Sequence, residues 1–399
     1  MVEIGEQTWN FIAKHKEDDV RNLALRPGNV EGVDLPLALR QIEGRQIALR
    51  KLPSWAATEE LLYPPHISME QCSSEQTALY KASLVGGESF ADLTGGFGVD
   101  FSFMCRGFKR AVYVERQELL CEVAAHNFSL MGLNHVEVKC GQASEFLAEM
   151  PLVDCVYLDP ARRDQYGRKV VSVADCEPDL TQLLPLLLAK SKKVLVKYSP
   201  MLDLSLALSA LGNVVEVHVV ATNNECKELL FLFDAEAQKG DLKIVCANLK
   251  REGDSLFSFT KSEESASACH LADAIGKYLY EPNVALMKGG AYKLLTQRYP
   301  VLKLDLNTHL YTSEELVPDF PGRIFDVEAC FSMSKSELKH HLSEVKAANI
   351  AVRNFPQTVA QLRDRLKLKE GGDLFLFATT VAGKKVIVKS RKLSTASFD

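Results

Sequence analysis

The feature that most constrains the fold is a regular alternation of short apolar segments and helical segments between Glu88 and Asp234. Such an alternation is typical of a mostly parallel sheet whose strands are connected by covering helices. The last two apolar segments are separated only by Thr222–Glu228, which is too short for a crossover helix, so we expect an antiparallel hairpin there. The sequence therefore predicts an α/β fold with one seven-stranded, Rossmann-like sheet. The expected strands are 90–93, 111–115, 136–140, 154–159, 193–197, 214–221 and 229–234.

The chain of 399 residues is long enough for several domains, and its patterns predict four parts. A helical N-terminal domain precedes the sheet domain. A small α+β region, for which a ferredoxin-like arrangement is one option, and a basic α/β module follow it. In chain order the predicted parts are 1–83, 84–237, 238–322 and 323–399.

Two local expectations concern the α+β region. Residues 261–267 are polar and are expected to form a linker, and residues 285–298 have the pattern of one helix. In the last module the expected order is β-α-β-α-β-β, with the final hairpin turning at Ala382-Gly383.

The composition is that of an ordinary globular chain. With 47% hydrophobic and 25% charged residues, wholesale disorder is excluded. No segment approaches the roughly 20 apolar residues that span a bilayer, and the polar start does not resemble a secretory signal. The ten cysteines form no CxxC pair, and the histidines lack metal-ligand spacing. We therefore expect a cytoplasmic protein with reduced thiols, no membrane association and no metal.

The net charge of −5 is unevenly distributed along the chain. Residues 335–399 contain thirteen Lys and Arg against six Asp and Glu, a net charge of +7, so the rest of the chain carries −12. A basic module on an acidic body is expected where one end of a protein binds a polyanion. The simpler explanation is that these charges only solvate the faces of helices and strands.

A glycine-rich motif follows the first expected strand, where the sequence runs Phe-Ala-Asp-Leu-Thr-Gly-Gly-Phe-Gly-Val-Asp from Phe90. A phosphate-binding P-loop needs a terminal Gly-Lys-Ser/Thr, and a dinucleotide fingerprint needs a small residue where Phe101 stands. The remaining pattern, an acid at the strand end before G-x-G, suits a ligand without pyrophosphate, such as S-adenosylmethionine. Its expected contacts here are Asp92, Thr94, Gly95, Gly96, Phe97 and Gly98.

The next three strands end in polar residues at suitable positions. Glu115 ends the second strand about twenty residues beyond the glycines, where a carboxylate can bind a ribose diol. Gln142 follows the third strand, where its side chain can reach the adenine amine. Asp159-Pro160 ends the fourth strand at the crevice where such sheets place their ligands. The further cofactor contacts that we expect are Glu115, Arg116, Gln142, Ala143 and Asp159.

In this order, these motifs resemble those of class I S-adenosylmethionine-dependent methyltransferases, whose sheet likewise ends in a hairpin. The segments Glu75–Lys81, Tyr311–Glu315 and Phe320–Arg323 are similar to those of bacterial members with a THUMP-like C-terminal domain. The resemblance implies S-adenosylmethionine as cofactor. Because related THUMP domains bind RNA, it also implies an RNA substrate, either rRNA or tRNA.

The expected catalytic residues are Asp159, Pro160, Arg162 and Lys197. Amine-methylating relatives usually have a second proline and an aromatic residue after the first proline, but Ala161 and Arg162 stand here. Uracil-C5 methyltransferases need a cysteine nucleophile after the fifth strand, and none is present there. Arg162 or Tyr166 would have to replace the missing aromatic residue. We expect methylation of a base nitrogen rather than of a ribose 2′-O.

A second constellation leaves ribose 2′-O methylation open. Lys81, Asp159, Lys197 and Glu228 follow the order of the tetrad of ribose 2′-O-methyltransferases, in which a lysine with a lowered pKa helps to deprotonate a hydroxyl. Two further hypotheses are an RNA-binding protein that keeps the fold without turnover and a small-molecule methyltransferase. The residues expected to contact substrate are Arg163, Tyr166, Arg168, Lys169, Lys385 and Lys389.

Overall fold

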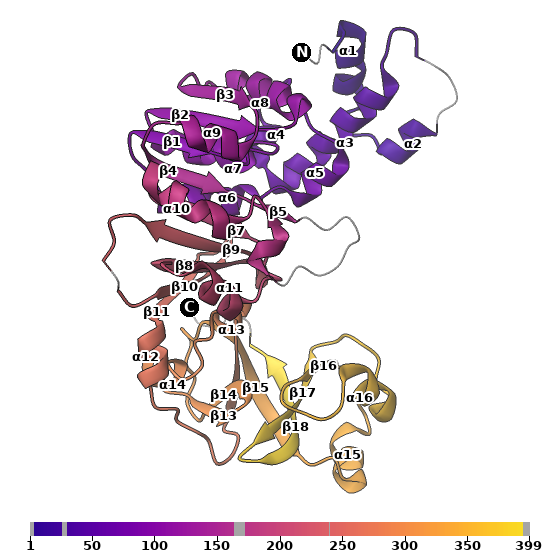
Figure 1. The fold of residues 1–399 in the computed structure, drawn as a ribbon. Helices are drawn as coiled ribbons and strands as arrows, with labels where there is room; N and C mark the ends of the chain where they lie inside the picture. Colours follow the sequence, from indigo (N-terminus) through magenta and orange to yellow (C-terminus); the bar gives the residue numbers. More distant parts are fainter. Residues whose placement is uncertain (1–3, 26–29, 163–171, 239, 394–399) are drawn as a thin grey trace. The chain divides into compact units, whose positions relative to one another are not determined.

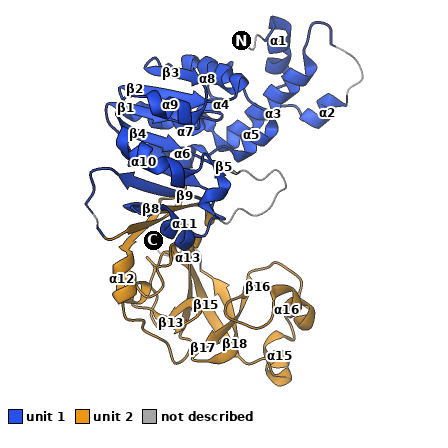
Figure 2. Ribbon diagram, in the orientation of Figure 1, with its two compact units in different colours: residues 1–217, 228–240 blue, residues 218–227, 241–399 orange. Residues whose placement is uncertain are grey.

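The computed structural model describes residues 4–25, 30–162, 172–238 and 240–393 (Figure 1). The chain divides into two compact units, as Figure 2 shows. Unit 1 comprises residues 1–217 and 228–240, and unit 2 comprises residues 218–227 and 241–399. No helix within the described ranges is long and apolar enough to cross a membrane.

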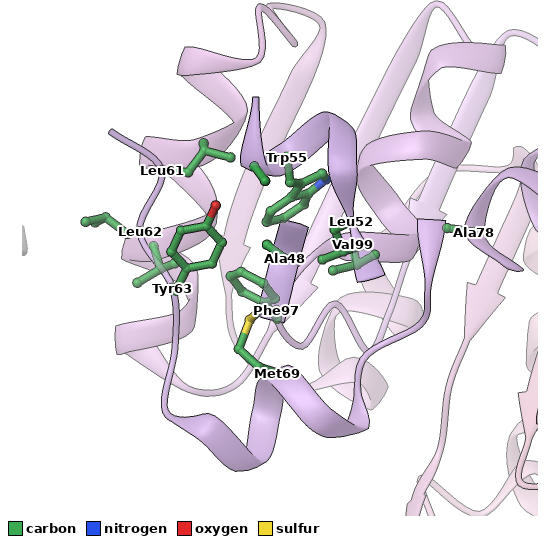
Figure 3. Close-up of a cluster of buried hydrophobic side chains, with 12 residues drawn as sticks. Ala48, Leu52, Trp55, Leu61, Leu62, Tyr63, Met69, Ala78, Phe97 and Val99 are labelled. Carbon is green, nitrogen blue, oxygen red and sulfur yellow. The ribbon is translucent and has the colours of Figure 1, made fainter. Parts of the chain in front are cut away.

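The described residues of unit 1 begin with six helices, and several of them start at a side-chain cap. Asp34 and Ser74 accept hydrogen bonds from the backbone N–H groups of Leu37 and Thr77, at the starts of α3 and α6. Residues of these helices pack with Phe97, Val99 and Val123 in a cluster of buried apolar side chains that includes Trp55 (Figure 3). The helices are α1 (Glu6–His15), α2 (Val20–Ala24), α3 (Leu35–Lys51), α4 (Pro53–Ala56), α5 (His66–Gln71) and α6 (Glu75–Leu84).

The first sheet has the order β11-β10-β8-β9-β7-β4-β1-β2-β3. Parallel pairing joins β7 to β4, β4 to β1, β1 to β2 and β2 to β3. Strand β9 pairs antiparallel with β7. Its strands are β1 (Ser89–Asp92), β2 (Arg110–Glu115), β3 (Val136–Cys140), β4 (Val153–Leu158), β7 (Ser191–Tyr198), β8 (Glu216–Thr222), β9 (Glu225–Asp234), β10 (Lys243–Leu249) and β11 (Ser255–Thr260).

The mixed α/β class that we predicted is confirmed, but the predicted number of seven strands is wrong. The sheet has nine strands because β10 and β11 continue it beyond β8. The expected hairpin is present between β8 and β9, where Asn223 and Asn224 adopt positive φ angles of 50° and 64°.

Helices connect the parallel strands of this sheet. Helix α8 packs against β2 and β3, and α10 packs against β7 (Figure 1). The helices are α7 (Val99–Met104), α8 (Glu118–Leu130), α9 (Ala143–Glu149), α10 (Leu180–Lys190) and α11 (Leu204–Leu211), with short β5 (Ala161–Arg162) and β6 (Cys176–Glu177) strands forming a separate pair.

Unit 2 contains a second sheet, of seven strands in the order β13-β14-β12-β15-β18-β17-β16. Strand β12 pairs antiparallel with β14 and β15, and β18 pairs antiparallel with β15 and β17. The strands are β12 (Tyr278–Pro282), β13 (Leu302–Asp305), β14 (Thr308–Ser313), β15 (Gly322–Phe331), β16 (Asn349–Val352), β17 (Leu374–Val381) and β18 (Lys384–Lys392). The last two helices of this unit are α15 (Lys335–Leu342) and α16 (Val359–Leu366).

Two local predictions in unit 2 are wrong. The polar segment 261–267 is largely helical, because Thr260 and Glu263 form a capping box at the start of α12 (Lys261–Ala266). The expected single helix over 285–298 is two short ones, α13 (Val284–Gly289) and α14 (Leu295–Arg298). Gly290 ends α13 with a φ of 86°, a left-handed conformation that glycine adopts without steric cost.

Candidate active site

The glycine-rich motif forms a tight turn between β1 and α7. The Thr94 N–H donates to Asp92 Oδ1 at 2.9 Å, and the Gly98 N–H donates to the Gly95 carbonyl at 2.9 Å. A Cβ atom at Gly95 would lie 2.1 Å from the Tyr113 ring, so only glycine fits there without movement. The turn therefore presents backbone close to the end of the sheet, where a ligand can approach it.

Asp92 lies at the end of β1 with only 2% of its surface exposed. Burial raises the pKa of its carboxyl group well above the usual range, and the charges of Asp100, Asp159 and Glu115 raise it further, against the hydrogen bond from Thr94. A carboxyl group in this setting is stabilised in its ionised form by a cation. It therefore fits a ligand with an ammonium group, such as the amino-acid part of S-adenosylmethionine.

Glu115 ends β2 beside the same turn. Its two carboxylate oxygens accept hydrogen bonds from the Gly96 N–H and the Gln117 N–H, each at 2.9 Å. The Tyr113 hydroxyl donates to the Gly96 carbonyl. These contacts hold the carboxylate in one orientation, with lone pairs left for the two hydroxyls of a ribose.

The remaining predicted cofactor residues differ in their surroundings. Gln142 is exposed at the start of α9, and Ala143 is half-buried beside it. Arg116 forms an exposed ion pair with Glu177 at 3.3 Å. Phe97 packs edge to face on Trp55, with 4.8 Å between ring centroids, so its side chain belongs to the apolar cluster of unit 1 (Figure 3).

Asp159 follows β4 and connects the glycine turn to β7. Its backbone N–H donates to Thr94 Oγ1 at 2.6 Å, and its Oδ2 accepts from Lys197 Nζ at 2.6 Å. The Asp159 side chain is 39% exposed, whereas that of Lys197 is 13% exposed. Pro160 behind it is buried. Asp159 therefore offers a partly exposed carboxylate, one oxygen of which is held by the Lys197 ammonium group.

Lys197 also belongs to a buried ion cluster, which we define as Lys81, Asp100, Lys197 and Glu228. Lys81 Nζ donates to both oxygens of Glu228 at 2.6 and 2.7 Å and lies 3.2 Å from Asp100 Oδ1. Lys197 Nζ lies 3.5 Å from Asp100 Oδ2. The tetrad Lys81, Asp159, Lys197 and Glu228 is thus brought together in space, with Asp100 as an additional member.

The charges of the buried ion cluster shift one another's ionisation. Burial alone would raise the pKa of Asp100, but the ammonium groups of Lys81 and Lys197 lower it to about 2. Burial lowers the pKa of Lys197, but Asp159, Asp100 and Glu228 outweigh it, so the pKa lies above its usual range. The tetrad implies a lysine with a lowered pKa, whereas the three carboxylates around Lys197 raise its pKa.

The predicted substrate residues fall into two groups. Arg163, Tyr166, Arg168 and Lys169 lie outside the described residues. In unit 2, Lys385 Nζ donates to the Asn354 carbonyl at 3.0 Å and to Thr380 Oγ1 at 2.5 Å. Lys389 pairs with Glu328 at 3.2 Å, so part of its charge is neutralised within the chain. For Arg162, the backbone pairs with Cys176 between β5 and β6.

Three residues of the site were not predicted from the sequence. Asp100 Oδ2 accepts hydrogen bonds from the Tyr157 hydroxyl at 2.8 Å and from Ser73 Oγ at 2.9 Å. Asp100 could have been found, because it is a lone acid in the otherwise uncharged helix α7 directly after the glycine turn. Ser73 and Tyr157 carry no such signal. Among the described residues no group of His, Cys, Asp and Glu is arranged to hold a metal ion.

Comparison with known proteins gives two domain-family matches in the C-terminal part of the chain and relatives that cover most of its length. Residues 278–321 match a ferredoxin-like domain family, and residues 322–392 match a family described as THUMP domain-like. The crystal structure of a candidate methyltransferase from Porphyromonas gingivalis W83 is 36% identical and superposes with a TM-score of 0.87 over 99% of this chain and 100% of that one. Uncharacterized S-adenosylmethionine-dependent methyltransferases from two strains of Mycobacterium tuberculosis are 24% identical over 82% of this chain and 85% of theirs.

Proposed function

This chain belongs to the bacterial class I S-adenosylmethionine-dependent methyltransferases with a THUMP-like C-terminal domain, and we propose that it methylates RNA. The observation that supports RNA most is the THUMP domain-like match over residues 322–392, in the part of the chain with a strong excess of basic residues. Methylation of a small molecule would leave the excess of basic residues in this module unexplained.

The residues at the ends of β1, β2 and β3 fit the cofactor. We propose that Asp92 binds its ammonium group, that the backbone of the glycine turn lies along it, and that Glu115 binds the ribose hydroxyls. We propose that Gln142, which is exposed at the start of α9, contacts the adenine. S-adenosylmethionine supplies a methyl group that its positively charged sulfur already activates, so the protein has mainly to align the acceptor and manage one proton.

Asp159 and Pro160 are the proposed acceptor site. The Asp159 carboxylate and the Pro160 carbonyl can together accept two hydrogen bonds, which suits the N–H groups of a base amine. The nitrogen becomes positively charged as it gains the methyl group, and the neighbouring carboxylate stabilises that charge. Lys197 remains an ammonium group and therefore acts as a donor to Asp159. These features favour a base nitrogen as the methylated atom.

Ribose 2′-O methylation is the second candidate, because Lys81, Asp159, Lys197 and Glu228 lie together as the tetrad of such enzymes requires. A hydroxyl needs a base to take up its proton, and a lysine can do so only as the neutral amine. The raised pKa of Lys197 opposes this role in the structure. The base nitrogen therefore remains our first proposal.

The experiment that tests the proposal uses total RNA from a strain that lacks this protein. The purified protein is incubated with this RNA and with S-adenosylmethionine carrying a tritiated methyl group, and the modified nucleoside is identified by mass spectrometry. RNA from the parent strain is the control, because it is already methylated and should accept less label. A methylated base supports our first proposal, and a 2′-O-methylated nucleoside supports the second. Binding of S-adenosylmethionine without any label in RNA would contradict both.

A further inference from the structure

We propose that Asp100 is a positioning residue that holds the Lys197 side chain as an ammonium group against Asp159. The inference rests on the proposed function in one respect, namely that Asp159 faces the methyl acceptor. We place Asp100 out of contact with the acceptor, because only about 10% of its side chain is exposed, against 39% for Asp159. Its effect on the reaction therefore passes through Lys197.

The position of Asp100 is fixed from three sides. It lies in the first turn of α7, directly after the glycine turn. Its Oδ2 accepts hydrogen bonds from Tyr157 on β4 at 2.8 Å and from Ser73, just before α6, at 2.9 Å. Tyr157 is fully buried, and burial together with the nearby carboxylates raises its pKa, so it donates as a neutral hydroxyl. Asp100 therefore connects the cofactor turn to the strand that ends at Asp159.

The charge balance explains why Lys197 needs Asp100. Lys81 and Lys197 face Asp100 and Glu228, so the buried ion cluster is neutral as a whole. Lys81 is completely buried and binds both oxygens of Glu228, and it cannot reach the acceptor. Asp100 lies between the two ammonium groups, with Oδ1 3.2 Å from Lys81 Nζ and Oδ2 3.5 Å from Lys197 Nζ. It is the buried carboxylate in contact with Lys197, and the partly exposed Asp159 adds one negative charge on the other side.

The contacts of Lys197 determine how the Asp159 carboxylate is oriented. Lys197 Nζ donates to Asp159 Oδ2 at 2.6 Å and to Ser73 Oγ at 3.3 Å, and it lies 3.5 Å from Asp100 Oδ2. The ammonium group thus donates two hydrogen bonds, and the Asp100 carboxylate faces it as an ion-pair partner. One oxygen of Asp159 is thereby fixed, which leaves the other for the acceptor. The titratable groups that face Lys197 are Asp100, Asp159, Glu228, Lys81, Tyr157 and the thiol of Cys72.

The direct test measures the ionisation of Lys197 without any methyl transfer. The full-length protein is labelled with trace acetic anhydride, which acetylates an amine only in its neutral form, between pH 7 and pH 11. Labelling of Lys197 is quantified by mass spectrometry relative to its value in the unfolded chain. In the wild type we expect Lys197 to stay unreactive beyond about pH 10.4, the usual midpoint of a lysine. In Asp100→Asn the midpoint should fall by at least about one pH unit, which is a tenfold rise in labelling at a given pH.

A matched control comes from the opposite end of the same strands. Asp154 at the start of β4 pairs with Lys192 on β7 at 2.8 Å, which raises the pKa of Lys192. Asp154→Asn should therefore raise the labelling of Lys192 and leave that of Lys197 unchanged. If Asp100→Asn labels Lys197 no more than the wild type does, the proposal is overturned. If Asp100→Asn does not fold, the labelling of the wild type alone tests the proposal. A labelling midpoint for Lys197 at or below about pH 10.4, the usual value of a lysine, overturns the proposal as well.

Kinetics provide the second readout, with the RNA of the deletion strain as acceptor. Asp100→Asn should lower kcat at least roughly tenfold with little change in the KM for RNA, and the alkaline limit of activity should move to lower pH. A residue with only a structural role would lower the melting temperature without moving this limit. If the labelling shift occurs but no RNA is methylated, the proposed function fails while the role of Asp100 in holding Lys197 stands.

Discussion

Replacing Lys81 by methionine should destabilise unit 1 strongly. The Lys81 ammonium group is completely buried and lies 2.6 Å from Glu228 Oε1 and 3.2 Å from Asp100 Oδ1. With an effective dielectric constant of about 20, the closer contact alone has a Coulomb energy of about 6 kcal/mol, part of which offsets the cost of burying both charges. Removing one partner of a buried pair costs about 3–5 kcal/mol, because the other charge stays buried. We therefore expect Lys81→Met to lower the free energy of unfolding by about 3–5 kcal/mol.

Urea denaturation monitored by tryptophan fluorescence measures this effect. Both tryptophans of the chain, Trp9 and Trp55, lie in unit 1, so the signal reports on this unit. The double variant Lys81→Met/Glu228→Gln should be more stable than Lys81→Met alone, since it no longer buries an unpaired Glu228 carboxylate. The control is Lys109→Met, whose exposed pair with Glu88 should matter little. Two results would show that the buried pair of Lys81 and Glu228 does not stabilise unit 1 in this way. One is a free energy of unfolding for Lys81→Met within about 1 kcal/mol of the wild type, and the other is a double variant less stable than Lys81→Met.

Three further predictions concern other parts of the chain. Asp92→Asn should weaken S-adenosylmethionine binding in calorimetry, yet melt at a higher temperature than the wild type. Because burial raises the pKa of Asp92, ionising its carboxyl group destabilises the folded wild type. The difference in melting temperature should therefore be absent below about pH 4 and grow as the pH rises. Gly95→Ala should lower the stability by about 1–3 kcal/mol in urea denaturation through the clash with Tyr113, whereas Gly141→Ala, with open space around it, should not. Lys385→Glu should weaken RNA binding in filter assays and make it less dependent on salt, and an unchanged salt dependence would exclude Lys385 from the interface.

The strands of the first sheet could be predicted because each is a short apolar run with a recognisable end. Strand β3 (Val136–Cys140) was predicted with its observed bounds, and β1, β2 and β4 within one residue. Strands β12, β13 and β14 were missed, since their alternation is weak and their burial depends on the other strands of the second sheet. The break at Gly290 was missed for a related reason: the apolar spacing continues through it, and only the backbone conformation reveals the end of α13.

The candidate site could be predicted in outline but not in its electrostatics. The order of the motifs predicted that Asp92, Glu115 and Asp159 lie at one edge of the sheet, because parallel strands end on the same side. The parallel pairing of β1 with β2 and β4 agrees with this prediction. The partners of Lys197 come from β4, α7 and β9, and their distances follow from packing that no local pattern encodes. The sequence suggested a lysine of lowered pKa, whereas the packed structure surrounds it with carboxylates.

The role of Asp159 in methyl transfer is tested by the methylation rate of Asp159→Ala with RNA of the deletion strain and saturating S-adenosylmethionine. Asp159 is partly exposed and its loss leaves Lys197 beside Asp100 and Ser73, so the melting temperature should stay within a few degrees of the wild type. The rate should fall at least roughly a hundredfold, because the acceptor loses the group that orients it. Asp154→Asn, at the other end of β4, should keep the wild-type rate. An Asp159→Ala protein that methylates RNA as fast as the wild type would contradict the account and place the reaction centre elsewhere.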